Sequence, residues 1–198
     1  VVLSVIAGDS QGGEGPDRVL DNNASTLWHT DWYGTSRDNH WIQFELSEDY
    51  VVDGLRYLPR EGSSNGIITQ YEIQISNDGE NFETIASGNW ASNKSWKAAE
   101  FGGVRAKYVR LVAVDAVTDN SYVFASAAEI RLTGEAYTEP PVVNPFTDVP
   151  EGIFYYESVL WAVGKGITTG ATATTFNPNG KCTRAEVVTR SEERRVGK

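Results

Sequence analysis

Short stretches in which apolar and polar residues alternate recur through the first two thirds of the chain. In residues 41–46, Ile42, Phe44 and Leu46 alternate with polar side chains. Because successive side chains of a strand point to opposite faces, this spacing predicts a strand with one buried face.

A second alternation, at Tyr71, Ile73 and Ile75, precedes a turn at residues 77–79 and further apolar positions beyond it, which is the pattern of a hairpin. Several short strands with polar turns between them are typical of a β-sandwich or jelly roll. We therefore expect a mainly β fold over residues 1–136, with further strands at residues 108–114 and 129–132.

The pattern changes after residue 136. Residues 137–145 contain three prolines, which keep the backbone extended and predict a linker. Beyond it, apolar residues at helical spacing predict a helix over residues 154–165, with Gly166 as a left-handed cap and Trp161 off the main apolar stripe. A second helix is expected at Thr183, which forms a capping box with Glu186.

The composition excludes several classes of partner. The net charge of -10 disfavours nucleic acid and anionic membranes, which need clustered Lys and Arg, and favours a neutral or cationic ligand. The single cysteine, Cys182, excludes an internal disulfide framework and a Cys-rich zinc site, and we expect it to be a buried thiol. No apolar run has the length of a membrane span, so we expect no membrane insertion.

Both ends indicate a fragment. The chain has no Met, so we expect the true N-terminus to lie upstream. Residues 190–198, RSEERRVGK, resemble the conceptual translation of a sequencing-library adaptor, and we interpret them as an artefact; the alternative is a solvated charged tail.

Three strings in order, GEGPDRVLDNNASTLWHTDW, YLPREGSSNG and VFASAAEIRL, resemble family 32 carbohydrate-binding modules of the discoidin, or coagulation factor 5/8 type C, superfamily. The resemblance covers nearly all of residues 1–134. It implies a discoidin-like jelly-roll β-sandwich whose loops bind a terminal galactose or N-acetylgalactosamine. The implied sugar-binding residues are the hydrogen-bonding Glu14, His29, Arg60 and Asn65 and the stacking Trp32 and Phe124.

Each of these residues also has an ordinary structural interpretation. His29 alone would be a structural histidine, and Arg60 a solvated loop charge. We expect Trp28 and Trp41 to belong to the core and His40 to lie in a surface loop.

The resemblance also implies a structural Ca²⁺ ion that joins the two ends of the domain. The side chains of Asp21, Asn23, Thr26 and Glu129 are oxygen donors of the kind that Ca²⁺ prefers, and main-chain carbonyls at Leu20 and Ala128 are implied as further ligands. The alternative is an Asx turn at residues 21–22 with Glu129 exposed.

Residues 146–189 resemble a partial S-layer homology repeat, a small α-helical unit that is truncated here. The marks are FTDV with Asp148, the helix with Trp161, GITTG ending at Gly170, FNP, and TRAE with Arg184. The family implies noncovalent attachment to anionic secondary cell-wall polysaccharide through these four residues, with Arg184 as the anion partner. The alternative is a plain helix pair in which Asp148 and Arg184 are solvated. One repeat alone is not expected to bind wall material.

These features together favour a non-catalytic module in a secreted bacterial protein, held at the cell surface and, by the habit of the family, attached to a glycoside hydrolase. Two alternatives remain open. One is a protein- or phospholipid-binding adhesion domain, although the corresponding loops here are polar and acidic. The other is part of a glycoside hydrolase's catalytic region, with Asp31 beside His29 or Glu14 facing Asp31 as candidate pairs.

Overall fold

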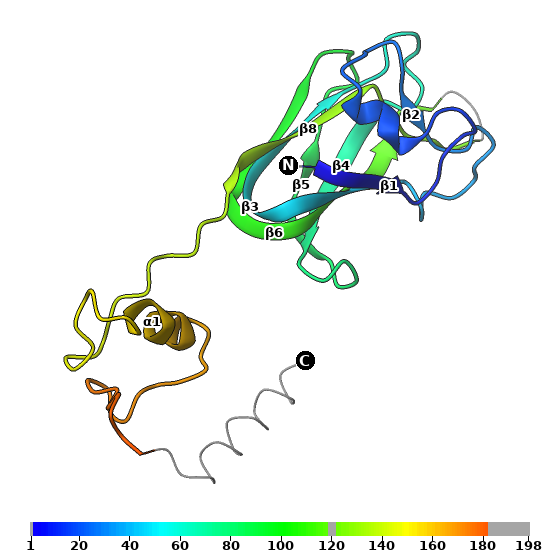
Figure 1. Ribbon diagram of the computed structural model, residues 1–198. Coiled ribbons are helices and arrows are strands. Elements are labelled where there is room, and N and C mark those ends of the chain that lie inside the picture. Colours follow the sequence, from blue (N-terminus) through cyan, green and yellow to red (C-terminus); the bar gives the residue numbers. More distant parts are fainter. Residues whose placement is uncertain (1, 119–121, 182–198) are drawn as a thin grey trace. The chain divides into compact units, whose positions relative to one another are not determined.

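The computed structural model describes residues 2–118 and 122–181, and the chain divides into two compact units, residues 1–138 and 139–198. All the strands of the described residues lie in the first unit, and helix α1 lies in the second (Figure 1). The elements of the first unit are β1 (Val2–Ala7), η1 (Pro16–Leu20), β2 (Trp28–His29), β3 (Trp41–Leu58), β4 (Ile68–Ser76), β5 (Glu83–Asn89), β6 (Lys97–Ala116), β7 (Ser126–Ala127) and β8 (Glu129–Ala136).

The first unit is built on a six-stranded sheet. Its order is β1-β3-β6-β4-β5, with β8 also paired to β3, and every pairing is antiparallel. The long strands β3 and β6 curve around the core, so that the sheet curls on itself (Figure 1). A small second sheet pairs β2 with β7. The predicted mainly β sandwich is thereby confirmed.

The predicted strand at residues 41–46 is the first part of a much longer element. β3 continues to Leu58 because the register shifts between Glu45 and Tyr50 and again between Val52 and Gly54, which lets one strand bend past the core. At Gly54 there is no room for a side chain, since a Cβ atom would lie 2.7 Å from the hydroxyl of Thr133.

The core of the first unit combines aliphatic side chains with a stack of aromatic rings. The Trp90 ring stacks on Tyr71 with centroids 3.9 Å apart and on Tyr57 at 5.2 Å. The buried Tyr57 hydroxyl donates to the carbonyl of Ser126 and accepts from the amide of Ile68. This bonding holds the ends of β4 and β7 beside each other, close to the loops described below.

The second unit contains α1 (Tyr156–Gly164), which lies within the predicted residues 154–165. Its small core contains Phe146, Val149 and Val159, and Gly166 has the left-handed conformation expected of a cap, with φ of 66°. No helix among the described residues is long and apolar enough to cross a membrane. The predictions for Cys182, Thr183, Glu186 and residues 190–198 lie outside the described residues.

Candidate functional site

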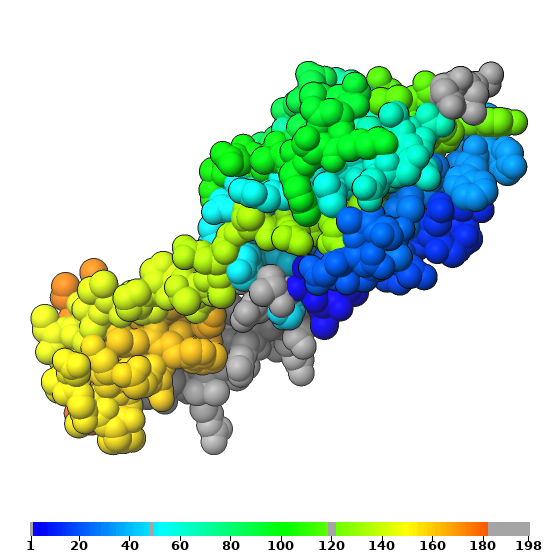
Figure 2. Space-filling model, turned by 90° about the horizontal axis from the view of Figure 1, so that it is seen from above, coloured from blue at the N-terminus to red at the C-terminus, as the bar shows by residue number. Residues whose placement is uncertain are grey.

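Four loops meet at one end of the first unit, and they are the loops that bear Glu14, Trp32, Arg60 and Phe124. The backbone amide of His29 donates to Glu14, and that of Gln11 to His29, which joins the first two loops. Pairing of β2 with β7 places His29 opposite Ser126, whose amide in turn donates to Gly66. The blue and light-blue atoms of residues 2–40 are contiguous along one side of this unit in Figure 2. All six predicted sugar-binding residues belong to these joined loops.

His29 lies at the centre of this arrangement. Its side chain is buried, and its ring contacts those of Phe124 and Trp32 at centroid distances of 5.4 and 6.4 Å. Nδ1 lies 2.6 Å from the carbonyl oxygen of Thr30, so in the neutral ring Nδ1 is the donor and Nε2 keeps its lone pair. Burial lowers the pKa of His29, and the charge of Arg60 lowers it further. His29 therefore presents a neutral acceptor near pH 7.

Trp32 supplies the exposed apolar surface of the site. Its side chain is 47% exposed, whereas Phe124 is 5% exposed and its ring contacts that of His29. The indole Nε1 donates to Oε2 of Glu14 at 3.1 Å. Of the two predicted stacking residues, Trp32 thus offers a ring face to solvent, while Phe124 supports the histidine.

Arg60 and Asn65 come from the loop after β3. The side chain of Arg60 is partly exposed, and its buried Nε atom has no hydrogen-bond partner among the described residues, so no protein acceptor holds that nitrogen. The Asn65 main chain is held by the Ser63 hydroxyl, and the next residue, Gly66, has φ of 81° and would place a Cβ 2.7 Å from the Ser126 hydroxyl. A glycine is therefore required beside Asn65. A cleft of about 340 Å³ lies next to Arg60, lined also by Ala24, Ser25, Leu27, Glu61 and Gly62.

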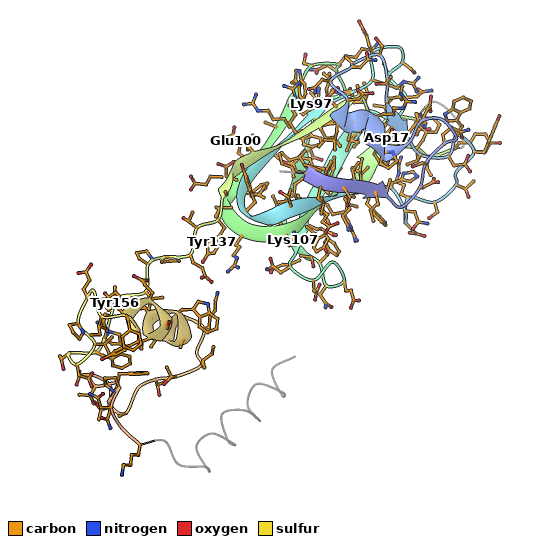
Figure 3. The ribbon with its side chains drawn as sticks, viewed as in Figure 1. Asp17, Lys97, Glu100, Lys107, Tyr137 and Tyr156 are labelled. Carbon is orange, nitrogen blue, oxygen red and sulfur yellow. The ribbon has the colours of Figure 1, made fainter. Side chains whose placement is uncertain are left out.

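The predicted calcium ligands lie where η1 meets β8. Figure 3 marks η1 with Asp17, and this turn packs against both β8 and β1. Asp21 accepts hydrogen bonds from the Asn23 amide and the Thr26 hydroxyl, so an Asx turn is present. Glu129, however, is buried rather than exposed as the alternative required.

The donor set fits a hard cation. Oε1 of Glu129 is buried with no hydrogen-bond partner among the described residues, and burial together with the charge of Asp21 raises the pKa of Glu129. A buried carboxylate oxygen without a partner, close enough to a second carboxylate to feel its charge, is stabilised by a cation bound there. The described residues bring together no group of three His, Cys, Asp or Glu side chains, so a cation here would need amide, hydroxyl and main-chain oxygens among its ligands.

The structure corrects one prediction and confirms another nearby. His40 was expected in a surface loop, but it is 1% exposed, because its carbonyl joins β6 through Ala113 and draws the ring into the fold. Trp28 is fully buried, as predicted, and its Nε1 donates to the carbonyl of Asp9.

The residues of the candidate catalytic pairs form hydrogen bonds with other groups. Asp31 accepts from the amide of Tyr33, and Glu14 accepts from Trp32. Within the described residues no hydrogen bond or ion pair joins His29 to Asp31 or Glu14 to Asp31.

In the second unit, Asp148 binds the backbone. Its two oxygens accept from the amides of Phe176 and Asn177 at 2.8 and 2.7 Å, which joins FTDV to FNP. Trp161 is 56% exposed, and Gly170 has φ of 81° with Phe146 against it, where a Cβ would clash at 2.4 Å. Arg184 lies outside the described residues.

Two aromatic residues at the rim were not predicted. Tyr33 and Tyr122 are exposed, and their rings pair edge to face. The loops predicted to be polar and acidic are therefore aromatic as well. Tyrosines in polar loops beside Trp32 and Phe124 were a signal, but their pairing depends on two segments about ninety residues apart in the chain.

Curated relatives match the first unit. The chain is 35% identical over 143 residues to a galactose oxidase of Gibberella zeae, covering 69% of this chain and 21% of that protein. It is 33% identical over 120 residues to a sialidase of Micromonospora viridifaciens, covering 59% and 18%. The chain thus spans about a fifth of the length of the relatives it matches.

Solved structures match the same region. One is CpGH89CBM32-5 from Clostridium perfringens, in complex with GalNAc-β-1,3-galactose, at 33% identity and a TM-score of 0.57, covering 65% of this chain and 93% of that one. Another is the family 32 module of NanJ from the same organism, in complex with galactose, at 27% identity and a TM-score of 0.57, covering 65% and 91%.

Family models account for both units. The S-layer homology domain model matches residues 145–188, and the F5/8 type C domain model matches residues 4–130. With its curled β-sandwich and the family 32 modules among its structural neighbours, this chain belongs to the F5/8 type C, or discoidin, family as a carbohydrate-binding module followed by an S-layer homology domain.

Proposed function

We propose that the first unit binds glycans that end in galactose or N-acetylgalactosamine. The observation that carries this proposal is the gathering of polar groups around the exposed ring of Trp32. Glu14 accepts a hydrogen bond from that ring, His29 contacts it, and the charge of Arg60 is close enough to lower the pKa of His29. A sugar needs both hydrogen-bonding groups for its hydroxyls and an aromatic surface for its apolar face. Two structural neighbours hold galactose-containing ligands, which supports the same class.

The roles follow from the chemistry of each group. The lone pair on Nε2 of His29 accepts from a sugar hydroxyl, and the Arg60 guanidinium donates to a sugar oxygen. Asn65 can do both. An adjacent pair of an acceptor and a donor can distinguish an axial from an equatorial hydroxyl, because only one orientation reaches both. With few hydrogen bonds and one stacking surface, we expect a Kd in the millimolar to micromolar range.

A Ca²⁺ ion bound at the junction of η1 and β8 would stabilise the module without taking part in sugar binding. Asp21, Asn23, Thr26 and Glu129 would hold it, with the carbonyls of Leu20 and Ala128. The unpartnered buried oxygen of Glu129 is the observation that supports this site.

The S-layer homology domain supports a place for the parent protein on the outside of a bacterium. Anionic secondary cell-wall polysaccharide is the proposed partner of that domain, with Asp148, Trp161, Gly170 and Arg184 as its residues. Because the first unit matches enzymes over only a fifth of their length, a catalytic domain such as a glycoside hydrolase would lie elsewhere in the parent protein.

The test is a glycan array with the whole chain in Ca²⁺, comparing the wild type with Arg60→Ala. The matched control is Arg56→Ala, which removes an exposed arginine from β3 outside the site. We expect the wild type and Arg56→Ala to bind terminal galactose-type glycans and Arg60→Ala to lose them. Equal binding by Arg60→Ala would contradict the proposed site. Binding of the wild type to no glycan at all would contradict the proposed function.

A further inference from the structure

Tyr33 and Tyr122 form a paired aromatic surface at the rim of the proposed sugar site. Their ring centroids lie 5.5 Å apart at 88°, and the side chains are 68% and 37% exposed. Edge-to-face pairing of this kind is favourable, but it leaves much apolar ring surface in water. A pair of exposed rings from two different loops is therefore a candidate contact surface.

The backbone holds this pair in place. The amide of Val123 donates to the carbonyl of Gly34 at 2.8 Å, which joins the two loops next to the tyrosines. The Tyr33 amide donates to Asp31, and the Thr118 hydroxyl donates to the carbonyl of Tyr122. A surface fixed in this way before binding loses little conformational entropy when a ligand arrives.

The pair is continuous with the sugar site. Tyr33 directly follows Trp32. Tyr122 precedes Phe124 by two residues, so the Cα atoms of Tyr122 and Phe124 lie within about 7 Å of each other. On both loops the tyrosine thus lies within two positions in the chain of a residue of the proposed sugar site.

We propose that Tyr33 and Tyr122 form a second subsite, which holds the next sugar of the same glycan. This inference rests on the proposed sugar-binding function. The apolar face of a pyranose ring packs on aromatic rings while its hydroxyls stay in water. The carboxylates of Asp31 and Glu14 lie next to the tyrosine pair. The guanidinium of Arg37 at the Phe124 carbonyl is already paired with Asp115, so the local charge disfavours sialic acid or sulfate groups. The occupant is thus a neutral sugar, and the ligand is a neutral oligosaccharide of at least two residues.

The test compares a monosaccharide with disaccharides by calorimetric titration of the whole chain. The probes are methyl β-galactoside, GalNAc-β-1,3-galactose, Gal-β-1,3-GlcNAc and Gal-β-1,4-GlcNAc. We expect the wild type to bind at least one disaccharide about two- to tenfold more tightly than the monosaccharide. The double variant Tyr33→Ala, Tyr122→Ala should keep the monosaccharide affinity and lose the gain, whereas Tyr33→Phe should retain it.

Glu61→Ala is the matched control, because it alters the cleft on the Arg60 side instead. If the double variant keeps the gain, if Glu61→Ala alone removes it, or if no disaccharide binds more tightly than the monosaccharide, the second subsite is wrong while sugar binding stands. If the wild type binds none of the four probes, the proposed function fails and the subsite fails with it.

Discussion

The indole Nε1 of Trp32 donates a 3.1 Å hydrogen bond to Oε2 of Glu14, a residue 18 positions earlier in the chain. The loop that bears Glu14 is also bonded to His29 through the backbone. The orientation of the one exposed ring predicted to stack on sugar therefore depends on a carboxylate from another loop. A side chain oriented in advance binds more tightly because less freedom is lost on binding.

Glu14→Ala should weaken binding of methyl β-galactoside about three- to tenfold, since it removes both an acceptor and the partner of Trp32. Glu14→Gln should lose less, because its amide oxygen can still accept from Nε1. Titration of both variants against the wild type measures the difference. Equal losses in the two variants would show that the negative charge, rather than the orientation of Trp32, is what matters.

Removal of Ca²⁺ should lower the Tm of the first unit. A chelator leaves Glu129 buried beside Asp21 with no cation between them, which destabilises the fold. In Glu129→Gln the chelator should have much less effect, because the repulsion and the ligand are both removed. Thermal unfolding with and without chelator, followed for both proteins, is the measurement. A wild-type Tm that does not respond to the chelator contradicts the site.

Acid should destabilise the first unit through His40. Burial, and then the charge of Arg37, lower the pKa of His40 from 6.5 to about 4. Since the unfolded chain takes up a proton near pH 6.5 and the folded chain does not until about pH 4, stability falls as the pH drops between these values, by about 3 kcal/mol in total.

His40→Leu separates this effect from the titration of carboxylates. Both ring nitrogens of His40 lack a hydrogen-bond partner among the described residues, so an apolar replacement leaves no polar group unpaired there. The stability of the variant, measured by denaturant unfolding at several pH values, should fall less than that of the wild type between pH 6.5 and 4. Parallel curves would contradict the assignment.

Asp148→Ala should loosen the second unit at the FNP segment. The amide of Phe176 and then that of Asn177 stabilise the ionised carboxylate and lower its pKa below 3.8, so this contribution is present above pH 3.8 and is lost as the pH falls through the lowered value. Amide hydrogen exchange at Phe176 and Asn177 should speed up in Asp148→Ala and less in Asp148→Asn. Unchanged exchange, as expected of the exposed control Glu151→Ala, would mean that these bonds contribute nothing.

The amino-acid sequence by itself determined the class of fold and named the candidate residues of the site. The alternation around Phe44 and Ile73 identifies strands because burial of one face is a local, two-residue pattern. The helical spacing before Gly166 identifies α1 because burial of one helix face is also a local pattern, with a period of about 3.6 residues. Three strings that resemble the family pattern pointed to His29, Arg60 and Asn65 before any geometry was known. The fold, and not their separation along the chain, brings such positions together.

Only the tertiary structure decided how distant segments meet. The length of β3 depends on bulges that the pairing with β6 and β8 creates, and no local pattern encodes them. The burial of His40 and the unpartnered oxygen of Glu129 likewise follow from neighbours far away in sequence. The pairing of Tyr33 with Tyr122 joins loops about ninety residues apart. Packing between distant segments decides which side chains are buried, and burial in turn shifts their pKa values. Burial, pKa and long-range pairing could therefore not be derived from the sequence alone.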